Sequence, residues 1–145
     1  MLAFGPENAL PSYEWVGKDI AIELEKHHKI EFYRAEQQVI QSRVIFVVKI
    51  MPTLAWIYKQ KKSNKTLIYI PIDFFTHPSE LIKHSVCLSL FDAIFIHNQR
   101  LSNKIKQYNK RLFFIDNYLK YSLTRQPVYK QDGFLLWIGH LEYIA

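Results

Sequence analysis

The feature that most constrains the fold is an alternation of short apolar runs with longer segments of helical periodicity. Continuous runs of β-branched and aromatic residues, such as Val44–Val48, are typical of strands buried on both faces. The predicted strands cover residues 1–4, 29–33, 44–48, 66–70, 93–96, 111–115 and 134–138, and the predicted helices cover 13–28, 52–59, 78–90 and 98–108. Because strands that alternate with helices form βαβ units, the sequence predicts an α/β fold. We expect a Rossmann-like parallel sheet flanked by helices on both faces, with right-handed crossovers.

Length and cysteine content restrict the class of protein further. The 145 residues suffice for one domain with its own core. The single cysteine, Cys87, excludes an internal disulfide and a cysteine-rich zinc site, and its place inside a predicted helix favours core packing over nucleophilic chemistry. The amino terminus has no signal-peptide pattern, and no apolar run approaches the ~20 residues that a membrane-spanning helix needs. We therefore expect a cytoplasmic protein.

The net charge of +6, from 19 Lys and Arg against 13 Asp and Glu, points to a nucleic acid only if the basic residues form one patch. Instead they gather in two turns: Lys59, Lys61, Lys62 and Lys65, and Lys104, Lys106, Lys110 and Arg111. Both turns precede strands, so we expect them at the amino-terminal edge of the sheet. We predict no nucleic-acid partner. The turns are either solvated or form a peripheral contact with an anionic membrane surface, to which Tyr13 and Trp15 would add aromatic groups.

Ligands of open parallel sheets bind beyond the carboxyl ends of the strands, which selects a small set of loops. Their polar residues are Glu7, Asn8, Ser12, Glu14, Lys49, Asp73, His77, His97, Asn98, Asp116 and Asn117. Structural roles remain open for several of them: Ser12 and Asn98 are also plausible helix caps, Asp73 is a plausible cap or turn residue, and Asp116–Asn117 is a turn signal. Together they predict a polar cleft large enough for a sugar or a phosphate.

Several enzyme signatures are absent. The chain has no G-x-G-x-x-G, no G-x-x-x-x-G-K-[ST] and no G-x-S-x-G, which excludes the usual dinucleotide, P-loop and nucleophile-elbow sites. His77 and His84 are seven residues apart but have no third ligand, so we predict no metal site and no cofactor. With only four glycines, an anion site would depend on helix N-termini.

Six segments together resemble the amino-terminal half of a GT-B glycosyltransferase. They begin at Phe4-Gly-Pro, Pro11-Ser-Tyr-Glu-Trp, Ile68-Tyr-Ile-Pro-Ile-Asp, Phe91-Asp-Ala-Ile-Phe-Ile-His-Asn, Phe113-Phe-Ile-Asp-Asn and Phe134-Leu-Leu-Trp-Ile-Gly-His. In that family two Rossmann-like domains hold the acceptor and the nucleotide-sugar donor, with the chemistry between them and no required metal. The resemblance implies an acceptor-side domain over residues 1–130, and a linker with the first strand of a truncated donor domain over 131–145.

The resemblance also implies roles for individual residues. Asp73 and His97 become candidates for the catalytic base that takes a proton from the acceptor hydroxyl of an inverting enzyme. The residues expected to bind a sugar or glycolipid acceptor are Glu7, Asn8, Ser12, Glu14, His77, Asn98 and Asn117. A nucleotide-sugar donor would bind only through the missing domain, so we expect no glycosyl transfer by this chain alone.

Two other functions remain open. The first is a stand-alone α/β binding or scaffold module that acts through protein–protein contacts, and self-association through the apolar residues 134–145 is expected under either reading. The second is a small flavodoxin-like nucleotide-binding or signalling domain, although the first strand lacks the acidic cluster of a receiver domain.

Overall fold

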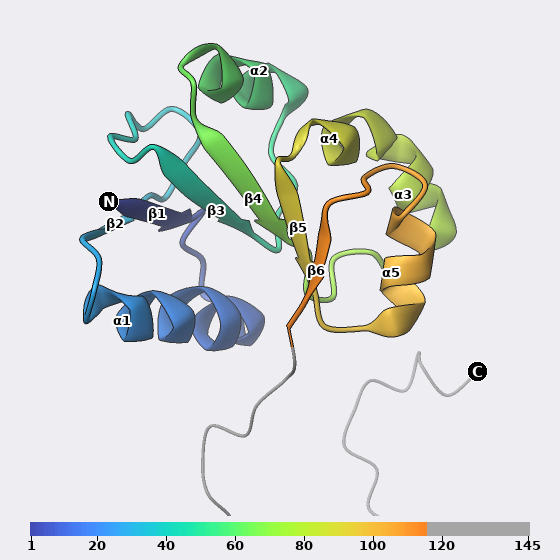
Figure 1. Cartoon of the computed structure of the whole chain (residues 1–145), viewed down its shortest axis with the longest axis horizontal. Coiled ribbons are helices and arrows are strands. Elements are labelled where there is room, and N and C mark those ends of the chain that lie inside the picture. The colour runs from blue at the N-terminus through green and yellow to red at the C-terminus, as the bar shows by residue number, and fades with distance from the viewer. Residues whose placement is uncertain (116–145) are drawn as a thin grey trace, which may run out of the picture.

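Six parallel strands form one sheet in the computed structural model, which describes residues 1–115 (Figure 1). In chain order they are β1 (Leu2–Gly5), β2 (Ile30–Phe32), β3 (Val44–Val48), β4 (Thr66–Ile70), β5 (Ala93–Ile96) and β6 (Leu112–Phe114). Their spatial order is β2-β1-β3-β4-β5-β6, and every neighbouring pair is parallel. The predicted parallel sheet is confirmed. Its strand order reverses direction between β1 and β3.

Helices cover both faces of the sheet, as predicted, but unequally (Figure 1). One face packs against a continuous helix that consists of a π-helical turn, η1 (Tyr13–Lys18), and α1 (Asp19–Glu25). The other face packs against α2 (Leu54–Lys62), α3 (Pro78–Lys83), α4 (Ser85–Leu90) and α5 (Gln99–Ile105). This division follows from right-handed crossovers, because the chain moves one way along the sheet from β1 to β2 and the other way from β3 to β6.

Alternate residues of β3 enter the two cores. Ile45 and Val47 pack on the side of α2 to α5, whereas Phe46 and Val48 pack on the side of α1. Phe46 stacks on Phe4 of β1 with ring centroids 4.4 Å apart. The uninterrupted apolar run of β3 is therefore a consequence of burial on both faces.

Two helices differ from the prediction. The helix expected over residues 78–90 is two helices, which join at His84, where the backbone leaves the helical conformation (φ −102°, ψ 12°). The His84 ring lies against Phe74, with centroids 5.5 Å apart. The helix expected from Pro52 begins at Leu54, because the Thr53 side chain caps it by accepting a hydrogen bond from the Trp56 N–H.

The strand predicted at 134–138, the second domain at 131–145 and the self-association assigned to residues 134–145 lie outside the described residues. Within residues 1–115, none of the helices has the length and apolar character that crossing a bilayer requires.

The side-chain amide of Asn109, in the turn after α5, hydrogen-bonds three backbone groups. The Asn109 Nδ2 donates to the carbonyls of Leu88 and Phe91, both at 2.9 Å, and its Oδ1 accepts from the Arg111 N–H at 2.8 Å. Asn109 is buried. It therefore joins α4, the turn before β5 and the start of β6.

We predict that Asn109→Ala lowers the free energy of unfolding by about 2–3 kcal/mol, because it leaves buried backbone groups without their hydrogen bonds. Urea denaturation checks this value. The matched control is Asn103→Ala on the exposed side of α5, where the amide bonds only Gln99, and we expect a change within ~0.5 kcal/mol. Equal losses in the two variants would contradict the assigned role of Asn109.

Candidate functional site

The carboxyl edge of the sheet opens where the strand order reverses. The chain leaves β1 toward the helix on one face and leaves β3 toward α2 on the other face, so the two loops diverge. In open α/β sheets this divergence creates the ligand crevice. Lys49 is the first residue after β3 and stands at this point.

Lys49 joins three segments of this edge through its side chain and its backbone carbonyl. Its Nζ donates to Ser12 Oγ at 2.9 Å and forms an ion pair with Asp73 Oδ1 at 2.8 Å. Its carbonyl accepts a hydrogen bond from the Tyr69 hydroxyl at 2.7 Å. One lysine therefore ties the loops that follow β1, β3 and β4 to one another.

Two residues beside this ion pair have left-handed backbone conformations. Lys49 has φ 61°, and Ile72, directly before Asp73, has φ 53°. Neither is a glycine, and the left-handed region is especially unfavourable for a β-branched side chain. Strained residues of this kind gather at functional sites, where the surrounding structure holds them in place.

A cavity of about 400 Å³ lies beyond the carboxyl ends of β4 and β5. Four of the predicted site residues line it: Asp73, His77, His97 and Asn98. Arg100 and Lys104 of α5 line it as well. Its volume lies within the range of small-molecule sites. The sheet brings together residues that are distant in the sequence, such as Asp73 and Lys104.

His97 has the proton chemistry of a base at neutral pH. The side chain is half-buried at the end of β5. Burial lowers the pKa of His97 below its ordinary value of 6.5, and the nearby Asp73 carboxylate opposes this shift in part. The imidazole is therefore mostly neutral at pH 7 and able to accept a proton, while Asp73 favours the protonated form.

Two of the cavity residues also cap helices. The Asn98 Oδ1 accepts hydrogen bonds from the N–H groups of Arg100 and Leu101, at the start of α5. His77 caps α3 in a capping box with Glu80. The sequence left a helix-capping role open for Asn98, and the structure confirms it. Asp73 does not cap α3, since His77 does.

Ser12 does not cap its helix either, so this expectation was wrong. The helix already begins at Pro11, and the Ser12 backbone is helical with no side-chain cap bond. Its hydroxyl accepts the hydrogen bond from Lys49 instead. Proline fits a first helical turn because its missing N–H has no partner there to lose.

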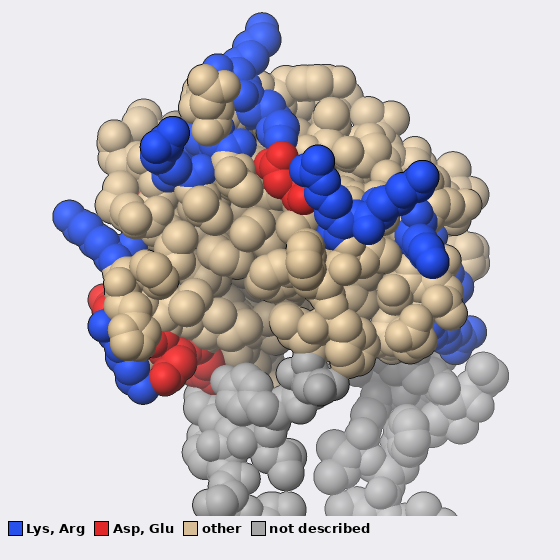
Figure 2. All heavy atoms as spheres, viewed as in Figure 1, with Lys and Arg blue, Asp and Glu red and all other residues tan. Residues whose placement is uncertain are grey.

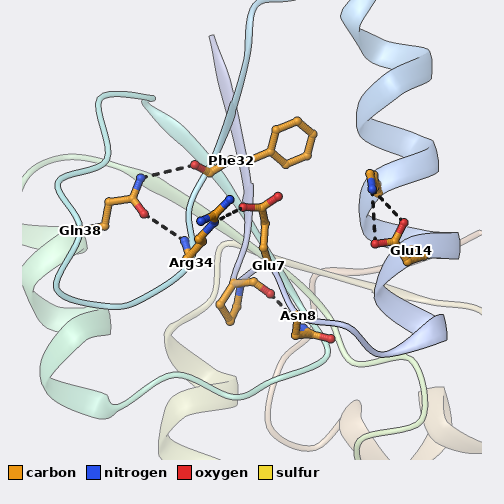
Figure 3. Close-up of polar contacts among 8 residues, drawn as sticks. Glu7, Asn8, Glu14, Phe32, Arg34 and Gln38 are labelled. Carbon is orange, nitrogen blue, oxygen red and sulfur yellow. Dashed lines mark hydrogen bonds and ion pairs between the residues drawn. The ribbon is translucent and has the colours of Figure 1, made fainter.

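Three predicted acceptor residues form polar contacts elsewhere and do not line this cavity (Figure 3). Glu7 accepts from Arg34 Nε at 3.0 Å, and Asn8 donates to the Pro6 carbonyl at 2.9 Å. Glu14 pairs with Lys18 at 3.1 Å, one turn along the same helix. Asn117 lies outside the described residues. The acceptor roles of these four residues stay predictions.

The basic turns lie mostly at the amino-terminal edge. Figure 2 shows Lys and Arg side chains spread over the end of the molecule that carries α2. There Lys61 pairs with Asp92 at 2.5 Å, and Asp92 also accepts from the Leu67 N–H at 2.8 Å. Lys104 differs from the prediction, because its side chain lines the cavity at the opposite edge. Side chains on a helix tilt toward its N-terminus, so the Lys104 side chain extends from α5 toward the carboxyl edge of the sheet.

Strand ends in the sequence place Lys49 among the polar residues of this edge, but without a catalytic or acceptor-binding role, and they assign no role at this edge to Arg100 or Lys104. The spacing of Arg100 and Lys104, four residues apart after a strand end, is a signal that places both on one face of α5. No sequence pattern predicts the contacts of the Lys49 side chain, because they depend on a left-handed backbone that glycine or asparagine normally adopts. In the described part of the chain, no three His, Cys, Asp or Glu side chains are grouped to hold a metal ion.

We predict that Asp73→Asn lowers the pKa of His97 further, because it removes the negative charge that favours the imidazolium. A pH titration of the histidine ring signals by NMR measures this change. His84 is the control within the same spectra: the charges that act on it are those of Lys83 and Glu80, so its pKa should not move. A His97 pKa that rises in Asp73→Asn would show that the two groups do not interact as described.

Comparisons with protein-family models, with curated proteins and with solved structures found no match to this chain.

Proposed function

We propose that this chain is the acceptor-binding domain of a GT-B-like glycosyltransferase, with a sugar or glycolipid acceptor in the cavity beyond β4 and β5. One observation carries the proposal: a half-buried histidine of lowered pKa, His97, shares this cavity with a carboxylate, Asp73. A neutral imidazole beside a carboxylate is an arrangement suited to removing a proton from a hydroxyl group. The parallel sheet, with its cavity at the carboxyl edge, supports the same proposal.

The proposed step assigns different roles to the two catalytic candidates. The acceptor oxygen attacks the anomeric carbon of the donor while its proton passes to an imidazole nitrogen of His97. The bond from the anomeric carbon to the donor diphosphate breaks, and the diphosphate leaves with the electron pair. Asp73 stabilises the imidazolium that forms. His97 rather than Asp73 takes the proton, because an imidazole is a stronger base than a carboxylate, and Asp73 already pairs with the Lys49 ammonium at 2.8 Å.

Positive charge in the cavity suits the same reaction. Arg100 and Lys104 line it, and within residues 1–115 neither forms an ion pair. Cations near a developing diphosphate favour its departure. In this proposal the nucleotide of the donor binds to a second domain, and the cavity supplies the acceptor, the base and part of the neutralising charge.

A second candidate is a protein-binding module. Strand β6 lies at the edge of the described sheet, where Phe113 and Phe114 are each 55% exposed. Exposed aromatic residues on an edge strand favour contact with another chain. This candidate leaves the left-handed Lys49 and Ile72 and the pairing of His97 with Asp73 without a role, so we place it second.

A flavodoxin-like signalling or nucleotide-binding domain is the third candidate, and the strand order favours it. The order 2-1-3-4-5 within this sheet is that of flavodoxin-like folds. However, β1 runs into Gly5-Pro6, and β3 is followed by Lys49 where a receiver domain carries an acidic residue. The carboxyl edge therefore has the wrong charge for a receiver domain.

The proposal predicts that the chain binds saccharides and that binding depends on the cavity. We expect His97→Ala and Asp73→Asn to weaken the binding of the best monosaccharide by about tenfold each, because the first removes a hydrogen-bonding group and the second replaces a charged acceptor oxygen with an NH2 donor. The ligands are glucose, galactose and N-acetylglucosamine, with saturation-transfer NMR for detection and titration for the Kd.

Two substitutions at exposed positions of the same residue types serve as controls. His28→Ala lies beyond the end of α1, and Glu23→Gln changes a carboxylate on the outer side of α1. Both should bind like the unchanged chain. Saccharide binding that is unaffected by His97→Ala and Asp73→Asn would contradict the proposal, and so would the absence of binding by all three sugars.

A further inference from the structure

A second cavity, of about 420 Å³, adjoins the first at the carboxyl edge. It is lined by Leu10, Pro11, Ser12, Trp15, Lys49 and Asp73. Asp73 lines both cavities, so they lie on the two sides of one side chain. Of its lining residues, Asp73 alone has a part in the proposed proton transfer, where it stabilises the imidazolium of His97.

Trp15 is the unusual residue of this cavity. It is 63% exposed, although large aromatic side chains are normally buried. It lies on the π-helical turn η1, whose Tyr13 and Gly17 face the core, and so it belongs to the opposite side of the helix. A π-helical turn inside a helix occurs frequently at functional sites.

The polar residues around Trp15 are already held in place. Lys49 Nζ contacts both Ser12 Oγ and Asp73 Oδ1 at less than 3 Å. The Lys49 side chain is only 19% exposed, whereas that of Asp73 is 64% exposed. A ligand therefore meets an available carboxylate, a hydroxyl group and an ammonium group beside an exposed indole.

We propose that this second cavity is a subsite for an additional sugar unit of the acceptor, which would make the acceptor an oligosaccharide or an oligosaccharide-bearing lipid. This inference rests on the proposed function. One face of a pyranose ring carries C–H groups and packs on an aromatic ring, and the hydroxyl groups at its rim both donate and accept hydrogen bonds. Asp73 accepts such bonds, Lys49 donates them, and Ser12 does both.

Charge and geometry favour a neutral sugar over an anion. The Lys49 ammonium is already neutralised by Asp73, so an anionic group would approach an exposed carboxylate. A membrane contact through Trp15 is less favourable, because Glu14 and Lys18 form an ion pair one turn apart on the same helix. The basic residues that would attract an anionic membrane lie mostly at the opposite edge of the sheet.

The test compares mono- and disaccharides. The probes are glucose, galactose and N-acetylglucosamine with their β1,4-linked disaccharides cellobiose, lactose and chitobiose. We expect the best disaccharide to bind about tenfold more tightly than the corresponding monosaccharide, because the second unit packs on Trp15. Trp15→Ala should abolish this gain and leave the Kd of the monosaccharide unchanged, whereas Trp15→Phe should retain part of the gain.

Tyr58→Ala is the matched control, since Tyr58 is an exposed aromatic residue of α2 that lines neither cavity. It should keep the full gain. The inference is overturned if Trp15→Ala keeps the gain, or if no disaccharide binds more tightly than its monosaccharide. It is also overturned if the emission of Trp15 responds to vesicles of phosphatidylglycerol and phosphatidylcholine but not to the disaccharides.

The same series separates this inference from the proposed function. His97→Ala acts on the first cavity and should weaken monosaccharides and disaccharides by the same factor. If His97→Ala changes neither, the proposed function fails. If it weakens both while Trp15→Ala has no effect, the proposed function stands and only the second subsite fails.

Discussion

The right-handed crossover between parallel strands is the constraint on which the rest of the structure depends. Because the chain starts in the interior of the sheet at β1 and then builds outward in both directions, helices must lie on opposite faces. The loops after β1 and β3 consequently diverge. The space between them is where Lys49 stands, and both cavities lie along the same edge. The position of the site therefore depends on the strand order more than on any single residue.

Lys49 holds the loops of this open edge together. A lysine in a left-handed conformation has an energetic cost, which its contacts with Ser12, Asp73 and Tyr69 offset. The same contacts fix Asp73 between the two cavities, where it acts on the pKa of His97 on one side and faces the exposed indole of Trp15 on the other. Binding and proton transfer, as proposed, therefore share one carboxylate whose position depends on one ammonium group.

The strands could be predicted from sequence because burial on both faces leaves a continuous apolar run: the expected bounds of β3, β4 and β5 match the structure. The break at His84 could not, since no proline, glycine or capping pattern in the sequence marks it. The rule for parallel sheets correctly gathered Asp73, His77, His97 and Asn98, because strand ends are visible in the sequence. It could not separate residues that face the cavity from Glu7, Asn8 and Glu14, which form polar contacts away from it. It placed Lys49 at this edge but could not predict its contacts with Ser12 and Asp73, which depend on a left-handed backbone conformation.

The central claim is that a saccharide binds at the carboxyl edge of this sheet, and mapping of backbone amide shifts by NMR during a saccharide titration tests it most directly. We expect perturbations at residues 10–15, 49–51, 72–77 and 97–104, which are four separate segments of the chain, with residues 59–65 and 106–111 unchanged. Perturbations confined to the basic amino-terminal edge or to β6 would contradict the account, because they would place the ligand where neither His97 nor Trp15 can reach it.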